Sequence, residues 1–471
     1  MDSVELAAGV IEAVRAAGVH EFCVCAGSRN APLLAVLGSL PVRLFSFVDE
    51  RSAAFFALGR IKLHGAPVAV VTTSGTAAAE LLPAAVEAFY SGLPLVLVTA
   101  DRPARFRGTG APQSIEQVGL FGVYASPSIA DWSRRGALHI NVEIDEPWND
   151  AVPAAGPAAS RAAAPKSGGG TPPRQPARTP AFRNAVVVIG ALADKHRGFV
   201  KERIHAPVYA EPLSGLREHS TIPFERMIKG FDHVIRIGNV PTLRFWRDLE
   251  SLDVEVTHFS DLPFPGLTRG EVYPIEELPE IHGRDIDQSD YTQRFEQILE
   301  DEPQSELAMF RKLSEELPDG ARIYLGNSLP IREWDLAATR EPRGFVYEAN
   351  RGANGIDGQL STFFGWCAPD ADNVCIVGDL TAIYDLGAPW IVPQLDARFR
   401  IVVINNGGGR IFGRVGALRG VDPALRARII ENEHDVRFEH WAKMWNIDVT
   451  ELRPDAEASR RSWERYDALW A

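Results

Sequence analysis

Residues 374–380 read V-C-I-V-G-D-L, and residues 401–406 read I-V-V-I-N-N. Each stretch is a short apolar run that ends in polar residues, and a helix-length segment separates the two. Such runs predict buried strands of an open α/β sheet, where ligands bind beyond the carboxyl ends of the strands. The sequence therefore predicts that Asp379 and Asn406 come together at one edge of a sheet.

The oxygen atoms at this predicted edge suit a magnesium ion bound to a diphosphate. Mg²⁺ prefers oxygen ligands and shares its shell with phosphate oxygens. The candidates are the Asp379 carboxylate, the Asn406 side-chain oxygen and the carbonyls of residues 407–409, with helical N–H groups facing the same point from Leu380 onward. Gly-Asp and Asn-Asn-Gly are also ordinary turn sequences, so either half alone would more often be a turn. Their pairing at two strand ends favours a site.

Composition limits the class of protein. The chain has 471 residues and 45% hydrophobic content, which suits two to three globular domains. Its 49 basic and 62 acidic residues give a net charge of −13, which argues against a nucleic-acid or acidic-membrane surface. The four cysteines lack metal-finger spacing and are typical of core thiols in a reducing compartment. Without a basic amino-terminal region or an apolar run of ~18 residues, we expect a cytoplasmic protein.

Apolar runs alternate with helical patterns and predict three doubly wound α/β domains. The first spans residues 1–150, a flexible Ala/Pro/Gly-rich linker follows at 151–180, and the second and third domains span 181–300 and 301–471. The expected strands lie at 21–25, 44–48, 68–71, 95–98, 139–142, 185–189, 234–237, 323–325, 374–377 and 401–404, and a helix is expected at 305–317.

Polar residues also follow strands of the first domain. Ser28 and Arg29 come after the strand at 21–25, Glu50 after the strand at 44–48, and residues 73–76 after the strand at 68–71. An acid in the first turn of a helix suits the helix dipole, and alone that is the better interpretation of Glu50. A metal-diphosphate site in another domain gives the Glu50 carboxylate a possible partner.

Eight motifs together resemble the MenD family, the thiamine-diphosphate-dependent 2-succinyl-5-enolpyruvyl-6-hydroxy-3-cyclohexene-1-carboxylate synthases of menaquinone biosynthesis. They are D-E-R at 49–51, T-S-G-T-A at 73–77, T-A-D-R-P at 99–103, G-A-P-Q-S-I at 110–115, G-N-S-L-P-I-R at 326–332, N-R-G-A-N-G-I-D-G at 350–358, G-D-L-T-A-I-Y-D-L at 378–386 and N-N-G-G-G-R-I-F at 405–412. They occur in the family's order over the first and third domains, which makes a chance match improbable.

The resemblance implies a fold, a reaction and its cofactors. The three domains would be the pyrimidine-binding, central and diphosphate-binding domains of thiamine-diphosphate enzymes. The enzyme would be a transferase that uses thiamine diphosphate and Mg²⁺ or Mn²⁺. It would decarboxylate 2-oxoglutarate and add the resulting succinyl-semialdehyde carbanion to isochorismate in a 1,4-addition, while the protein supplies position and electrostatics.

The resemblance also assigns residues. Glu50 would hydrogen-bond the cofactor's N1′ atom, and arginines would pair with the carboxylates of both substrates. The catalytic and substrate-binding set is Glu50, Ser28, Arg29, Arg102, Gln113, Arg244, Ser328, Arg332 and Arg351. The cofactor set is Glu50, Ser74, Gly75, Ile356, Gly378, Asp379, Leu380, Thr381, Asn406, Ile411 and Phe412, and the metal ligands are Asp379, Asn406 and the Gly408 carbonyl. Arg244 matches loosely, and a surface charge is its better interpretation in isolation.

The resemblance further implies a homodimer or a dimer of dimers, because Glu50 and the metal site of one active centre would come from different subunits. Two segments that the family pattern leads us to expect are absent, one near residues 132–134 and one near 449–450. Three alternatives stay open: another thiamine-diphosphate 2-oxo acid decarboxylase or carboligase, a cofactor-binding regulatory protein, and an inactive compacted relative. The arginine set argues against the first, and retention of Glu50 argues against the other two.

Overall fold

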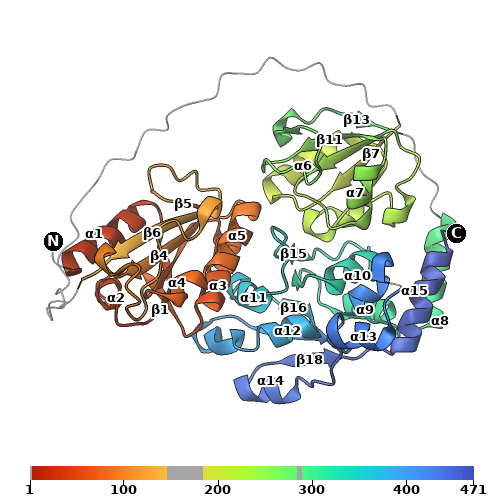
Figure 1. Ribbon diagram of the computed structural model, residues 1–471. Helices are drawn as coiled ribbons and strands as arrows, with labels where there is room; N and C mark the ends of the chain where they lie inside the picture. Colours follow the sequence, from red (N-terminus) through yellow and green to blue (C-terminus); the bar gives the residue numbers. More distant parts are fainter. Residues whose placement is uncertain (1–2, 146–183, 284–288, 419, 471) are drawn as a thin grey trace.

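The computed structural model describes residues 3–145, 184–283, 289–418 and 420–470. In this part of the chain the strands form three larger sheets and one two-stranded pair, and their pairings are parallel. The three sheets lie in successive parts of the sequence (Figure 1). This confirms the expected α/β fold, whereas the linker expected at 151–180 falls outside the described residues. No described helix is both long enough and apolar enough to cross a membrane.

The first sheet has the strand order β2-β1-β3-β4-β6-β5. Its strands are β1 (Glu21–Cys25), β2 (Arg43–Phe47), β3 (Val68–Thr72), β4 (Leu95–Asp101), β5 (Ala125–Ser126) and β6 (Ala137–Glu143), and its helices are α1 (Ser3–Ala16), α2 (Ala31–Gly38), α3 (Glu50–His64), α4 (Thr76–Ala79) and α5 (Leu82–Ser91). Strands β3 and β4 are buried along their whole length, as expected for parallel strands covered on both faces.

The chain between β5 and β6 is unusually direct. Residues 127–136 join these two parallel neighbours without the helical segment expected near 132–134, although such crossovers are usually longer. Trp132 in this loop packs into a hydrophobic core of the first domain, and its Nε1 donates to the Gly136 carbonyl at 2.9 Å. Arg134 donates to the Ala17 carbonyl at 2.8 Å, so the short loop is tied to the end of α1.

The second sheet has the order β12-β11-β10-β7-β9 and belongs to the central domain. Its strands are β7 (Ala185–Ile189), β9 (Val208–Ala210), β10 (His233–Ile237), β11 (Glu255–Phe259) and β12 (Val272–Tyr273); β8 (Ile204–His205) pairs with β13 (Ile281–His282), and the helices are α6 (Asp194–Arg203) and α7 (Arg244–Asp248). Buried Arg217 joins this domain to the third, because its guanidinium donates to four backbone carbonyls around the end of α10 (Leu329–Ala337).

The third sheet has the order β15-β14-β16-β17-β18. Its strands are β14 (Arg322–Leu325), β15 (Val346–Glu348), β16 (Asn373–Gly378), β17 (Phe399–Ile404) and β18 (Val449–Leu452). Its further helices are α8 (Ser289–Asp301), α9 (Glu306–Glu316), α11 (Gln359–Trp366), α12 (Asp379–Tyr384), α13 (Pro423–Ile429), α14 (Glu439–Trp445) and α15 (Ala456–Ala468). Gly378 pairs with Ile404, so Asp379 and the Asn405-Asn406 step leave the sheet side by side.

The carboxyl-terminal end of this domain is short. Edge strand β18 follows α14 and leads directly to α15, where another strand-and-helix unit was expected near 449–450. The loss falls at the edge of the sheet, whereas β16 and β17 lie inside it. The strands that carry the predicted metal ligands are therefore flanked on both sides.

Helices α3 and α11 join the first and third domains (Figure 1). Ten consecutive residues of α3 are buried, from Ser52 to Ile61, and Ser52 shares a 2.8 Å hydrogen bond with Ser361 of α11. Glycines allow the close crossing: a Cβ on Gly59 would lie 2.0 Å from the Thr362 carbonyl oxygen, and one on Gly365 would lie 2.2 Å from that of Phe56. Because Glu50 begins α3, this crossing fixes its position against the third domain.

Candidate active site

Asp379 links the ends of β16 and β17. One carboxylate oxygen, Oδ1, accepts from the Leu380 N–H at 2.6 Å, and the other, Oδ2, accepts from the Gly407 and Gly408 N–H groups at 2.8 and 2.9 Å. Burial raises the pKa of Asp379, although these three donors oppose the rise. Gly408 has φ +132°, and a Cβ there would lie 2.6 Å from the Glu431 carbonyl oxygen, so the close approach to Asp379 requires glycine.

Asn406 presents an oxygen beside this carboxylate. Its Nδ2 donates to both carboxylate oxygens of Glu306, at 3.2 and 3.1 Å. Its Oδ1 is buried and accepts no hydrogen bond from the part of the chain that the structure describes. The Gly408 carbonyl accepts from the Arg410 N–H at 2.8 Å and keeps a second lone pair. Asp379, Asn406 and Gly408 thus follow two neighbouring strands at one sheet edge, and their oxygens are of the kind that Mg²⁺ or Mn²⁺ binds.

Two buried acids lie behind Asn406. Glu306 begins α9 and Glu333 lies on α10, and burial raises the pKa of both carboxyls. Their side chains are hydrogen-bonded to one another, and the Trp463 Nε1 donates to Glu333 at 3.1 Å. Neither acid was predicted from the sequence, where an acid in a first helical turn, such as Glu306, is common. His434 is a third residue that we did not predict, and its Nε2 lies 3.4 Å from Asp379 Oδ2.

Glu50 is the first residue of α3. The Asp49 side chain caps this helix by accepting from the Ser52 N–H at 3.0 Å, which leaves the Glu50 carboxyl half-buried at the helix start. Desolvation by burial raises the pKa of Glu50, and the negative charges of Asp49 and Glu80 add to the rise. Glu50 is therefore an acid that holds its proton to a higher pH than an exposed one.

The loop after β3 carries unpaired hydroxyl groups. The side-chain oxygens of Thr72, Thr73 and Ser74 are buried and have no hydrogen-bond partner within the described chain. Gly75 follows with φ +85°, and its N–H donates to Gln117 at 2.9 Å. The chain is polar here but its polar atoms are unsatisfied, as expected where a polar ligand binds.

Other predicted residues of the first domain gather around this loop. Gln113 lies against Gly75, where an added Cβ would be 3.1 Å from the Gln113 Cα. Arg102 donates through Nε to the Pro112 carbonyl at 3.0 Å, which places it next to Gln113. Buried Gln117, which we did not predict, holds Gly75 through Oε1 while its Nε2 donates to Ala100 and Asn141.

Ser28 and Arg29 follow β1 on the same side of the sheet. A Cβ on neighbouring Gly27 would lie 2.5 Å from the Thr73 Cβ, so this turn packs directly on the loop after β3. Arg29 is buried and donates to the Ile144 carbonyl at 3.0 Å, whereas Ser28 is exposed. The structure thus brings these predicted residues together at the carboxyl ends of β1, β3 and β4, whereas Glu50 follows the edge strand β2.

Two arginines of the third domain form another group. Arg351 donates to Asn327 Oδ1 at 2.6 Å, and Arg332 donates to the Ser328 carbonyl at 2.5 Å. Burial lowers the pKa of Arg351 to about 10, and the positive charge of Arg332 contributes to that fall. Burial lowers the pKa of Arg332 too. Two desolvated guanidinium groups near one another favour anionic ligands with more than one carboxylate.

The structure does not bring Arg244 into this group. Its side chain is 62% exposed, and its guanidinium lies 3.7 Å from Asp248 on the same helix. The arginine of α7 whose charge acts on Arg332 is Arg247, one helical turn further on. Both positions are surface-like in the sequence, and only the direction of the helix distinguishes them.

The remaining predicted cofactor residues lie around these groups. Ile356 is half-buried just before Gly358, which has φ +68° and precedes α11. Thr381 is buried in α12, and Leu380 is half-buried there. Ile411 and Phe412 come after Gly407 and Gly408, in the short 3₁₀ turn Arg410–Arg414, and Phe412 is 38% exposed.

Glu50 and Asp379 lie on different domains, and no described hydrogen bond or ion pair joins the two side chains. Their nearest connection runs through the following residues, because Arg51 pairs with Asp385 at 3.1 Å, just beyond the end of α12. Asp385 in turn accepts from the Gly358 and Leu360 N–H groups at the start of α11. The loops of both domains are thus oriented by one network.

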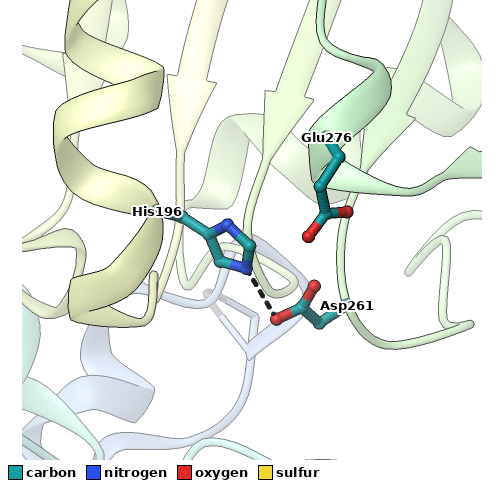
Figure 2. A group of neighbouring side chains, drawn as sticks. All are labelled: His196, Asp261 and Glu276. Atoms are coloured by element: carbon teal, nitrogen blue, oxygen red, sulfur yellow. Dashed lines mark hydrogen bonds and ion pairs between the residues drawn. The ribbon is translucent and has the colours of Figure 1, made fainter.

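Two further features lie away from these groups. A cavity of about 620 Å³ between the first and central domains is lined by residues including Phe89, Arg135 and Phe264, but by none of the predicted site residues. In the central domain, His196, Asp261 and Glu276 converge with their ligand atoms within 4.8 Å (Figure 2). His196 is hydrogen-bonded to Asp261 at 2.9 Å, and Lys195 lies 3.5 Å from the same oxygen, so this carboxylate already has an imidazole and an ammonium group as partners.

Known proteins resemble the chain over its whole length. Residues 4–120 match the family model for the thiamine pyrophosphate enzyme, N-terminal TPP binding domain. A 2-succinyl-5-enolpyruvyl-6-hydroxy-3-cyclohexene-1-carboxylate synthase of Bdellovibrio bacteriovorus is 40% identical over all of both chains. Proteins of the same name from Akkermansia muciniphila and Geobacillus thermodenitrificans are 39% and 31% identical over 93% of this chain, and over 89% and 87% of their own lengths. The Bdellovibrio alignment runs over 547 positions against 471 residues here, so that relative contains segments that this chain lacks.

Proposed function

The chain belongs to the family of 2-succinyl-5-enolpyruvyl-6-hydroxy-3-cyclohexene-1-carboxylate synthases, thiamine-diphosphate-dependent enzymes of menaquinone biosynthesis, and we propose that it joins 2-oxoglutarate to isochorismate with the residues described above. Thiamine diphosphate, when bound, supplies the carbon nucleophile for the decarboxylation and for the 1,4-addition that follows. The contribution of the chain is to hold the cofactor, to handle its protons and to orient two anionic substrates.

The observation that carries this proposal is the oxygen pair at the ends of β16 and β17. Asp379 and Asn406 Oδ1, with the Gly408 carbonyl, would hold Mg²⁺ or Mn²⁺ together with the cofactor's diphosphate. Asn406 Oδ1 supports this role because a buried acceptor without a partner is costly unless something binds to it.

Glu50 would exchange a proton with the cofactor's aminopyrimidine ring at N1′. Its raised pKa suits that role, because burial favours the protonated carboxyl that would donate to N1′. The unpaired hydroxyls of Thr73 and Ser74 lie in the same domain and would contact the cofactor from the loop after β3. Mere binding needs no such acid, and this argues for an enzyme.

The arginines would bind the carboxylates of the substrates. Arg29 and Arg102 belong to the first domain, and Arg332 and Arg351 belong to the third. Guanidinium groups pair with carboxylates through two parallel hydrogen bonds, which fixes both position and orientation. Four guanidinium groups offer more positive charge than a single carboxylate balances, so the set favours dicarboxylates over the simple 2-oxo acids.

The assembly that we propose is a homodimer or a dimer of dimers, with each active centre shared by two subunits. Glu50 and the metal ligands lie on separate domains, which allows each to face the matching half of a second chain. Gel filtration with light scattering measures the assembly. A fully active monomer would contradict it.

The function is tested with purified protein, thiamine diphosphate, Mg²⁺ and the two substrates. We expect rapid CO₂ release from 2-oxoglutarate only when isochorismate is present, together with a product that contains both carbon skeletons by mass spectrometry. Rapid CO₂ release without isochorismate would instead favour a 2-oxo acid decarboxylase. No turnover of either substrate, with the cofactor shown to be bound, would favour an inactive relative.

A further inference from the structure

Only the nitrogen of the Asn406 side-chain amide has hydrogen-bond partners within the described chain. Its Nδ2 meets both carboxylate oxygens of Glu306, while Oδ1 on the opposite side is buried without a protein partner. Glu333 donates the proton of its hydrogen bond to Glu306, because its pKa is raised further, so Glu306 accepts and the nitrogen of the amide must face it. The oxygen must then face away from Glu306.

Glu306 has no evident structural duty that would explain its burial. Helix α9 is already capped, because the Ser305 side chain accepts from the Ala308 N–H at 3.2 Å. The Glu306 N–H is satisfied as well, by the Ser459 hydroxyl at 3.0 Å. The Glu306 side chain is only 4% exposed, next to a second buried carboxyl on Glu333, where an apolar residue would cost less.

We propose that Glu306 is a positioning residue for the metal centre, which fixes the Asn406 amide with its oxygen toward the metal. This rests on the proposed roles of Asp379 and Asn406 as ligands. Without Glu306 the amide can rotate and present its NH₂ group, which cannot bind a cation. Residues behind a metal ligand that fix its orientation typically contribute roughly 10- to 100-fold to metal affinity.

The direct test measures Mn²⁺ binding to the full-length protein in the presence of thiamine diphosphate, by the loss of the free Mn²⁺ signal in electron paramagnetic resonance. We expect Glu306→Leu to weaken Mn²⁺ binding by roughly 10- to 100-fold. Glu306→Gln keeps an oxygen that can accept from Nδ2, so its affinity should stay within about threefold of wild type. Glu302→Leu is the matched control, because Glu302 is also buried but pairs with Arg461.

A double-mutant cycle separates orientation from general damage. Asn406→Asp places an oxygen toward the metal whichever way the side chain turns, so there is no amide left to orient. In that background, Glu306→Leu should cause no further loss of Mn²⁺ affinity and should improve it by removing a like charge. A loss equal to that seen in the wild-type background would overturn the proposal.

Thermal unfolding without metal distinguishes a merely structural role. We expect metal-free Glu306→Leu to unfold at the wild-type temperature or above, because it removes a buried carboxyl. A fall of many degrees in both Glu306→Leu and Glu306→Gln, with wild-type Mn²⁺ affinity in the Gln variant and no coupling to Asn406, would show that Glu306 serves only the fold.

The failure of this proposal is distinguishable from that of the proposed function. If Asp379→Ala abolishes Mn²⁺ binding while Glu306→Leu binds as wild type does, the metal centre stands and the role of Glu306 is wrong. If Asp379→Ala also binds Mn²⁺ normally, the proposed ligand set itself is wrong. If Glu306→Leu does not fold, Glu306→Gln in the Asn406→Asp background still decides, since affinity below that of Asn406→Asp alone would contradict the model.

Discussion

The loop after β3 and the loop after β17 both end a buried parallel strand, but they hold their polar groups in different ways. After β17, the Gly407 and Gly408 N–H groups donate to Asp379, which itself follows β16, and the Asn406 amide donates to Glu306. After β3, the hydroxyls of Thr72, Thr73 and Ser74 are buried without partners in the described chain. The protein itself thus orders the polar groups of the proposed metal site, whereas the hydroxyls at the end of β3 depend on the proposed ligand for hydrogen bonds.

The largest effect should come from Glu50. Glu50→Gln keeps the size of the side chain but cannot exchange a proton, so turnover should fall by roughly 10²- to 10⁴-fold while thiamine diphosphate still binds. Steady-state rates and calorimetric cofactor binding measure the two effects separately. Asp49→Asn is the matched control, because asparagine also caps helices and should preserve most turnover. Wild-type rates in Glu50→Gln would remove Glu50 from the chemistry.

The next largest effect should come from Asp379, which accepts hydrogen bonds from the loop after β17. Asp379→Ala removes the carboxylate that joins the two strand ends, so Mg²⁺-dependent cofactor binding should weaken by more than the roughly 10- to 100-fold typical of a residue behind a ligand. Asp372→Ala is the control, because Asp372 is exposed at the opposite end of β16. Equal cofactor affinity in the two variants would contradict the assignment of the metal site.

The crossing of α3 and α11 sets how the two loops face each other within the chain. Gly59→Ala would place a Cβ 2.0 Å from the Thr362 carbonyl oxygen, so we expect a loss of about 1–3 kcal/mol of unfolding free energy. Gly9→Ala, in the exposed part of α1 with no neighbour within 4 Å, should instead stabilise by about 0.5–1 kcal/mol. Denaturant unfolding measures both. A neutral Gly59→Ala would show that the crossing is looser than described.

The smallest effect should come from a single hydroxyl of the loop after β3. Ser74→Ala removes a buried group without a partner, so the free protein should be as stable as wild type or slightly more stable. Cofactor affinity should fall by roughly fivefold, the equivalent of about 1 kcal/mol for one hydrogen bond. Ser52→Ala should do the opposite and lower stability, because it leaves Ser361 unpaired. Equal stability losses in both variants would show that the Ser74 hydroxyl already has a partner in the free protein.

The strand pattern made much of the fold predictable from the sequence. Apolar runs such as those at 68–71 and 374–377 correspond to β3 and β16, and Asp379 and Asn406 meet where the pattern places them. Short or polar strands were missed, among them β11 (Glu255–Phe259), because their residues lack a continuous apolar run. The loss of the helix near 132–134 was visible only by comparison with a family pattern.

The residues that position the site residues could not be predicted from the sequence. Glu306 looks like an acid that suits the start of a helix, and only the tertiary structure shows that it bonds to Asn406, far along the chain. Arg244 and Arg247 are both basic residues of one short helix, and the direction of that helix decides which acts on Arg332. Long-range side-chain contacts follow from packing, which local spacing does not encode.

The central claim is that one active centre is built from two subunits. One subunit contributes Glu50 and the loop after β3, and the other contributes Asp379 and the loop after β17. The direct measurement mixes Glu50→Gln and Asp379→Ala subunits, each inactive alone, and exchanges them into hybrids. Every hybrid dimer then holds one centre with both Glu50 and Asp379 intact, so we expect isochorismate-dependent activity to reappear with exchange. No activity in verified hybrids would contradict the claim and would place Glu50 and Asp379 of a single chain in one centre, joined through α3 and α11.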